Sequence, residues 1–227
     1  MAVNGKRIAR VPHFEYLSDA DNVRTDCFAD EAELETVIAN LPADLQDYTR
    51  WCAAIGMRRG EAAALTWTML EEKSDVPLLR IPKHVCKNKK DRELPIIDGL
   101  ADILERRKLA RTFEWDGVTH VSEFIFHRNG RQIADFFKSW RTATRKAGCP
   151  GRLFHSTRRL AATNMLEAGL SPEVACAWTG HKSPSMLRRY QLIKTDKKAD
   201  GFSALEAYRA TQKAKVAAKS KKIVAIK

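Results

Sequence analysis

The chain has 227 residues, of which 44% are hydrophobic, and its 40 lysines and arginines exceed its 28 aspartates and glutamates by a net charge of +12. This apolar content excludes a disordered chain, and no apolar stretch approaches the roughly 18 residues of a membrane helix. No signal-peptide core is present at the start, so we expect a soluble cytoplasmic protein. A pI of 9.6 favours a polyanionic partner such as nucleic acid, although a merely basic protein would have the same balance.

The cysteines are scattered and contain no Cys-x-x-Cys pair. They are Cys27, Cys52, Cys86, Cys149 and Cys176. An odd, dispersed set of this kind is typical of reduced thiols and offers no metal-ligand spacing. We therefore expect neither a disulfide framework nor a zinc site.

Residues 1–27 are predicted to form an irregular basic lead-in, after which helical periodicity begins. Asp30 is placed to cap the first helix, and Glu33, three residues later, would complete a capping box. A second helix is predicted over about 43–55, where a glycine follows, and a third over about 61–69.

The pattern then becomes extended. Leu78–Ile81 and Glu93–Ile97 flank a turn rich in lysine and asparagine at 87–91. Together with residues near 67–71, these segments predict a small antiparallel sheet.

Helical patterns return at about 100–110, 133–147 and 156–168. Two further helix starts each place a serine before a proline, at Ser171 and Ser183. The predicted fold class is therefore α+β, mainly α-helical with one small antiparallel β-sheet.

Several polar residues together suggest phosphodiester chemistry. Breaking a phosphodiester without a metal requires a nucleophile, cations that hold the non-bridging oxygens, and a proton donor for the leaving oxygen. Arginine grips two oxygens with a fork that stays charged, and a tyrosine phenolate can attack and later leave. The chain offers such groups in this order: Arg58, Lys87, His155, Arg158, His181 and Tyr190.

Each of these residues also has an ordinary interpretation by itself, as a solvated cation or a structural histidine. Lys87 lies in a charged turn, where Lys89 is the competing candidate. Arg59 and Arg159 are interpreted as surface residues or contacts to a phosphate backbone. The tryptophans on helical faces are expected in the core, and no role is assigned to the remaining histidines.

The segments GMRRGEAAALTW, HSTRRLAATNMLEAG and GHKSPSMLRRY, in this order and at these separations, resemble the tyrosine recombinase (phage integrase) family. The similarity covers about residues 25–210. It implies that Tyr190 attacks the scissile phosphate, forms a 3′-phosphotyrosine and releases a 5′-hydroxyl. Arg58 and Arg158 would clamp the phosphate, and Lys87 would be the general acid. The resemblance implies no metal, ATP or organic cofactor.

The same resemblance gives supporting roles. His155 would hydrogen-bond the phosphate and assist proton transfer from the nucleophile, and His181 would supply a further hydrogen bond. Glu61, three residues after the first arginine, would support that arginine. The chain departs from the family pattern at Ser156 and Thr157, where an acidic residue and then an apolar one commonly follow the histidine.

By this resemblance the chain divides into a lead-in at 1–27, a catalytic domain at 28–212 and a basic tail at 213–227. Most family members carry a helical core-binding domain before the catalytic one, and the lead-in is too short to be that domain. The chain would then be a domain fragment, the product of a truncated element, or a short recombinase similar to the fimbrial-switch invertases.

The leading hypothesis is site-specific recombination of double-stranded DNA for a phage or mobile element, in the prokaryotic cytoplasm at the nucleoid. The family implies a homotetramer on DNA, in which a C-terminal helix beyond about residue 204 passes to a neighbouring subunit, with accessory DNA-bending proteins as further partners. Two alternatives remain. One is a type IB topoisomerase, and the other is an integrase remnant that binds DNA without productive recombination.

Overall fold

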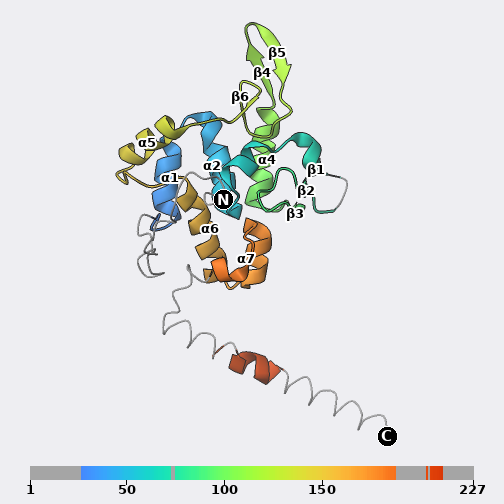
Figure 1. The fold of residues 1–227 in the computed structure, drawn as a ribbon, viewed down its shortest axis with the longest axis vertical. Coiled ribbons are helices and arrows are strands. Elements are labelled where there is room, and N and C mark those ends of the chain that lie inside the picture. The colour runs from blue at the N-terminus through green and yellow to red at the C-terminus, as the bar shows by residue number, and fades with distance from the viewer. Residues whose placement is uncertain (1–26, 73–74, 188–202, 204, 212–227) are drawn as a thin grey trace, which may run out of the picture. The chain divides into compact units, whose positions relative to one another are not determined.

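A computed structural model describes residues 27–72, 75–187, 203 and 205–211 (Figure 1). The chain divides into two compact units, 1–189 and 190–227. In the second unit, the described residues 205–211 are helical and solvent-exposed. The predicted lead-in, apart from Cys27, and the basic tail at 213–227 lie outside the described residues.

The first two helices form as the sequence predicts. Helix α1 (Glu31–Ala39) is capped by Asp30, whose side chain accepts a hydrogen bond from the backbone N–H of Glu33 at 2.8 Å. The Glu33 carboxylate in turn accepts from the backbone N–H of Ala29 at 2.6 Å. Helix α2 (Ala43–Ile55) ends at Gly56 in the left-handed conformation, with φ of 63°.

The third helix is shorter than predicted. Helix α3 spans only Arg59–Ala63, and a 3₁₀ turn, η2 (Trp67–Met69), follows. The intervening residues are extended because they pair with a distant segment: the backbone of Leu65 accepts a hydrogen bond from Ile125, and Thr66 bridges Phe124. Tertiary pairing therefore overrides the local helical pattern here.

The small antiparallel sheet is confirmed. Its order is β1-β2-β3, formed by β1 (Leu70–Glu71), β2 (Leu78–Ile81) and β3 (Arg92–Pro95). In the β2–β3 pair, Ile81 lies opposite Arg92. The turn that joins these two strands carries the lysines singled out in the sequence.

Two hairpins were not predicted. One joins β4 (Thr112–Trp115) to β5 (Val118–Val121) and projects from the rest of its unit (Figure 1). The other joins β6 (His127–Arg128) to β7 (Arg131–Gln132). Their turns are Asp-Gly and Asn-Gly, with positive φ at both residues, which is the strongest short hairpin signal in a sequence.

Four more α-helices follow in the described part of this unit. Helix α4 spans Gly99–Leu109, and α5 spans Phe137–Lys146, four residues later than expected, since residues 133–136 after the β6–β7 hairpin are not helical. Helix α6 spans His155–Glu167, and α7 spans Pro172–Thr179. The last predicted helix start forms a short 3₁₀ turn, η3 (Pro184–Met186).

Helix α2 lies at the centre of the core. Tyr48 and Trp51 on this helix are fully buried, and Tyr48 packs against the rings of Phe126, Phe136 and Phe154 with centroids 5.7 to 5.8 Å apart. Of the tryptophans predicted to be internal, Trp51, Trp67 and Trp140 are buried and Trp178 is partly buried. All five cysteines are free thiols.

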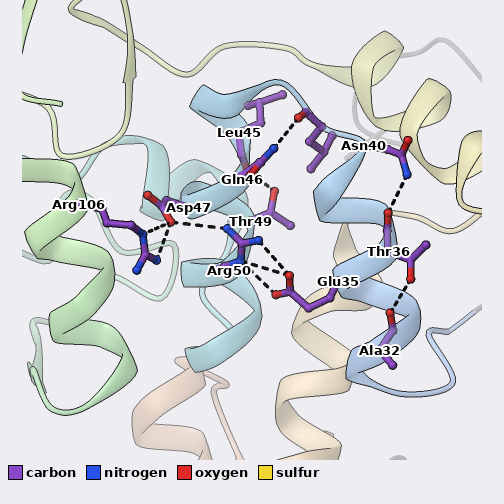
Figure 2. Close-up of polar contacts among 11 residues, drawn as sticks. Ala32, Glu35, Thr36, Asn40, Leu45, Gln46, Asp47, Thr49, Arg50 and Arg106 are labelled. Atoms are coloured by element: carbon purple, nitrogen blue, oxygen red, sulfur yellow. Dashed lines mark hydrogen bonds and ion pairs between the residues drawn. The ribbon is translucent and has the colours of Figure 1, made fainter. Parts of the chain in front are cut away.

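Ion pairs join the exposed faces of three helices (Figure 2). Arg50 of α2 pairs with Glu35 of α1 at 3.0 Å, and Asp47 of α2 pairs with Arg106 of α4 at 2.7 Å. Solvent-exposed pairs of this kind contribute about 0–1 kcal/mol each, so α2 is held mainly by its buried face. Among the described helices, none has the length and apolar content to cross a membrane.

Candidate active site

Arg158 is the most buried cation of the candidate site, with 2% of the residue exposed. Its Nη1 donates to the carbonyl of Gly56 at 2.6 Å and to the carbonyl of Thr179. These carbonyls belong to the C-terminal ends of α2 and α7, where backbone acceptors lack partners within the helix. One guanidinium on α6 therefore joins the ends of two other helices.

Gly56 makes this junction possible. Its φ of +63° is a conformation that L side chains rarely adopt, and a Cβ there would lie 2.8 Å from Cγ2 of Thr179. The close approach of α2 to α7 therefore requires glycine at this position. Its carbonyl is thereby held where Arg158 can reach it.

Arg58 occupies the N-cap position of α3, and its side chain is 21% exposed. Its Nη1 donates to Oε1 of Glu61 at 3.0 Å. The adjacent carbonyl of Arg59 accepts a hydrogen bond of 2.7 Å from the hydroxyl of the buried Tyr48. Because burial raises the pKa of Tyr48, its hydroxyl stays protonated and fixes the start of α3.

Glu61 is the anionic centre of the site, and only 3% of its side chain is exposed. Besides Arg58, its carboxylate accepts from the backbone N–H of Lys87 at 3.0 Å and from Nη2 of Arg92 at 3.4 Å. This one carboxylate thus joins α3 to both the turn and the strand of the β2–β3 hairpin.

The Lys87 side chain lies in the exposed turn between β2 and β3. Lys87 and its competitor Lys89 line the same pocket as Arg58 and Glu61. The backbone N–H of Lys87 donates to Glu61, whereas that of Lys89, which has a positive φ of 55°, donates to the carbonyl of Cys86 at 2.9 Å within the turn. The bond to the carboxylate of the site therefore favours Lys87 over Lys89.

His155 is the first residue of α6, one turn before Arg158, and both line one pocket together with Arg58. The preceding Phe154 anchors this helix start, because its ring packs 5.0 Å from both Phe136 and Trp140. The predicted three-residue spacing therefore brings this histidine and arginine to one cavity.

His181 follows Gly180, which ends α7 in the left-handed conformation at φ of 72°. Burial, and then the charges of Arg158, Arg58 and His155, lower the pKa of His181 to about 3. The imidazole is therefore neutral at physiological pH.

Thr179 selects the tautomer of His181. Its Oγ1 lies 2.6 Å from the carbonyl of Ala175 and 2.6 Å from Nδ1 of His181. Two oxygens at the first distance require the hydroxyl proton between them, so the hydroxyl donates to the carbonyl. The histidine must then carry its proton on Nδ1, and its Nε2 is a hydrogen-bond acceptor.

The predicted nucleophile, Tyr190, belongs to residues 188–202, which lie outside the described residues. Its position relative to the other candidate residues is therefore not described. The structure brings the other predicted residues to adjoining pockets. The residues so placed are Arg58, Glu61, Lys87, His155 and Arg158, with His181 within electrostatic reach. Within the described part of the chain, no group of three or more histidine, cysteine, aspartate or glutamate side chains could hold a metal ion.

Two neighbours of the site were missed from the sequence. Arg92, whose side chain is 9% exposed, contacts Glu61, and Thr179 contacts His181. Nothing in the sequence marked Arg92, because its burial and its contact with Glu61 arise from tertiary packing, and the predicted strand began one residue later. Nothing in the sequence distinguished Thr179 from other helix-terminal threonines.

The mainly helical body with small antiparallel sheets is the fold of tyrosine recombinase catalytic domains. The sequence matches the model of the phage integrase family over residues 28–196, and the chain therefore belongs to that family. No curated protein matches the sequence.

Three solved structures show the similarity. The XerH recombinase bound to palindromic difH substrate is 16% identical, with a TM-score of 0.60 over 84% of this chain and 56% of that one. The Tn1549 transposon integrase in complex with transposon right-end DNA is 18% identical, with a TM-score of 0.63 over 82% of this chain and 68% of that one. The catalytic domain of bacteriophage HP1 integrase is 23% identical, with a TM-score of 0.50 over 72% of this chain and 86% of that one. The chain thus spans little more than half of the XerH structure.

Proposed function

We propose that this protein is a site-specific DNA recombinase that cuts and rejoins double-stranded DNA through a 3′-phosphotyrosine at Tyr190, for a phage or mobile element. One observation carries the proposal: Arg58 lines one pocket together with His155 and Arg158, which lie far from it in the sequence, beside the turn of Lys87. Family membership and the nine-residue separation of His181 and Tyr190 support the nucleophile. Residues 28–212 would be the catalytic domain.

The arginines would bind the scissile phosphate. Arg158 is held by two backbone carbonyls, and Arg58 by Glu61, so both would meet the phosphate without further ordering. A guanidinium stays charged and offers two parallel donors to an anionic oxygen. Such preorganised donors lower the barrier as charge develops at phosphorus.

Proton transfer would involve the remaining groups. The Lys87 ammonium would protonate the leaving 5′-oxygen, and His155 would hydrogen-bond the phosphate and help to remove the phenol proton of Tyr190. The tautomer of His181 changes the role that the family resemblance implies for this histidine. Its Nε2 accepts, so it would receive a hydrogen bond from a hydroxyl or water while neutral, and would donate to phosphate only once protonated.

The partners follow from the same proposal. XerH, the Tn1549 integrase and a lambda integrase dimer are solved as complexes with DNA, which supports double-stranded DNA as the partner here. A net charge of +12 would favour binding to the phosphate backbone, with affinity that falls steeply as salt rises. Assembly as a tetramer on DNA, with DNA-bending accessory proteins, belongs to the proposal as well.

Covalent capture tests the chemistry. The protein is incubated with a random library of nicked suicide duplexes, and DNA that remains bound after denaturation is recovered and sequenced. We expect a Tyr190-dependent adduct on a defined site, lost in Tyr190→Phe while DNA binding by that variant persists. A folded protein that binds DNA but forms no adduct would contradict the proposal. Relaxation of a supercoiled plasmid carrying the recovered site, without strand exchange, would indicate a topoisomerase instead.

A further inference from the structure

Arg92 is a buried cation beside the candidate site that has no role in the chemistry described above. It is the first residue of β3, and its side chain is only 9% exposed. Its Nη2 lies 3.4 Å from Oε2 of Glu61, and its buried Nε has no hydrogen-bond partner among the described residues. Placing a guanidinium here is costly, because burial disfavours its charge. The carboxylate of Glu61 is the anion that offsets this cost.

The contact with Glu61 controls how that carboxylate is oriented. One oxygen, Oε2, faces Arg92, while the other, Oε1, accepts from Nη1 of Arg58 and from the backbone N–H of Lys87. A carboxylate is planar, so a cation held at one oxygen fixes the direction of the other. Arg92 therefore sets the acceptor that holds the Lys87 turn in place.

Arg92 also contacts the loop that carries His181. A Cβ at Gly180 would overlap Nη1 of Arg92 and would lie 3.5 Å from Nη1 of Arg58. The β2–β3 hairpin thus packs through Arg92 directly on the end of α7. Because Ile81 and Arg92 form the last pair of that hairpin before its turn, this contact anchors the turn at its base.

We propose that Arg92 is a positioning residue for Lys87, acting through Glu61 and through its contact with Gly180. The inference rests on the proposed function, in which Lys87 is the general acid. In that step the tyrosine gives up its phenol proton with the help of His155, its oxygen forms a bond to phosphorus, and the bond from phosphorus to the 5′-oxygen breaks. The leaving oxygen takes a proton from the Lys87 ammonium, which becomes a neutral amine. Without Arg92, the Glu61 carboxylate can turn, and the lysine loses its fixed place.

A sulfur substitution separates this role from phosphate binding. The test compares a normal suicide duplex with one in which sulfur replaces the bridging 5′-oxygen at the scissile phosphate. A thiolate leaves without being protonated, so a defect in delivering the proton disappears on the sulfur substrate. A defect in clamping the phosphate persists on both substrates.

We expect Arg92→Gln to slow single-turnover cleavage of the oxygen substrate by about 10- to 100-fold, the range expected for a small misplacement of a catalytic group. On the sulfur substrate its rate should return to within about threefold of the unmodified protein. Lys87→Ala should be rescued in the same way, and Arg158→Lys should not. Arg80→Gln is the matched control, because Arg80 lies on β2 of the same hairpin and, among the described residues, its ion-pair partners are the exposed Glu71 and Glu93. It should leave both rates unchanged.

Two results would overturn the proposal. One is an Arg92→Gln rate that falls equally on both substrates, and the other is a rate that falls on neither. Cleavage of the oxygen substrate by the unmodified protein tests the proposed function separately. Amide hydrogen exchange provides a readout that needs no activity: exchange at the Lys87 N–H should be faster in Arg92→Gln and in the milder Arg92→Lys than in Arg80→Gln. Equal exchange in these variants would also overturn the proposal.

Discussion

The candidate site has two sides that are built differently. On one side, Arg158 is buried and bonded to the carbonyls of Gly56 and Thr179, where three helices meet. On the other, Lys87 lies on an exposed turn whose backbone is bonded to the carboxylate of Glu61 and whose base packs on Gly180 through Arg92. The first side is rigid because helix packing fixes it. The second depends on a few polar contacts, so single substitutions should affect it without disturbing the fold.

The difference is suited to the proposed chemistry. A phosphate clamp gains most from donors that need no reorganisation when charge develops. A general acid must approach the leaving group and release a proton, which an exposed turn permits. The following predictions test this contrast, beginning with the largest expected effect.

Removing the buried clamp should have the largest effect. Arg158→Ala deletes a guanidinium and leaves two helix-end carbonyls without this donor, so single-turnover cleavage should fall by about 10²–10³. Thermal unfolding should shift to lower temperature in the same variant. The comparison variant is Arg50→Ala on the ion pair shown in Figure 2, for which cleavage should be unchanged. Equal losses in the two variants would contradict the assignment.

Removing the charge of Glu61 should destabilise the side of the site that carries Lys87. Glu61→Gln leaves Arg58 and the buried Arg92 without their counter-charge, and the free energy of unfolding should fall by about 3 kcal/mol. Urea denaturation measures this loss. Glu35→Gln, at an exposed pair, should cost less than about 1 kcal/mol. A Glu61→Gln loss as small as that of the control would show that the anion does not hold the hairpin.

The junction of α2 and α7 should be sensitive to a single methyl group. Gly56→Ala forces a strained φ and a contact with Thr179, so it should cost about 1–3 kcal/mol in the free energy of unfolding. Gly60→Ala is the matched control: it lies within α3, and its Cβ would have no neighbour within 4 Å. It should be neutral or stabilise by up to about 1 kcal/mol. A destabilisation of similar size at both glycines would rule out the close approach.

The pH dependence of stability should reflect His181. Its folded pKa of about 3 lies below the usual 6.5, so the unfolded chain takes up this proton first as pH falls. Because of this group, the free energy of unfolding should fall as the pH is lowered from 6.5 towards 3. Above pH 6.5 this group should cause no change with pH. Arg158, Arg58 and His155 are the charged groups that act on it. His181→Asn should lower the slope of unfolding free energy against pH in this range, and an unchanged slope would contradict the assignment.

The tautomer of His181 should depend on Thr179, and this is the subtlest effect. Nitrogen NMR should find the neutral ring protonated on Nδ1 in the unmodified protein and in Thr179→Ser, which keeps the hydroxyl. Thr179→Val removes that acceptor, and the proton should shift towards Nε2. A ring protonated on Nε2 in all three proteins would show that the hydroxyl donates to the imidazole.

Much of the fold could be predicted because its signals are local. The Asp30 cap, the Gly56 stop and the proline after Ser171 mark helix ends that the structure confirms. The two missed hairpins also had local signals, at Asp116-Gly117 and Asn129-Gly130. The end of α3 could not be predicted, because it depends on pairing with residues some sixty positions later in the chain.

By itself, the sequence determined the order of the chemical groups and the family, since spacing along a helix or turn is a local property. Only the tertiary structure decided which groups share one environment. The partners of Glu61, the burial of Arg92 and the tautomer of His181 all arise where segments distant in the chain meet. Such contacts depend on how helices and strands pack, and no local pattern encodes them.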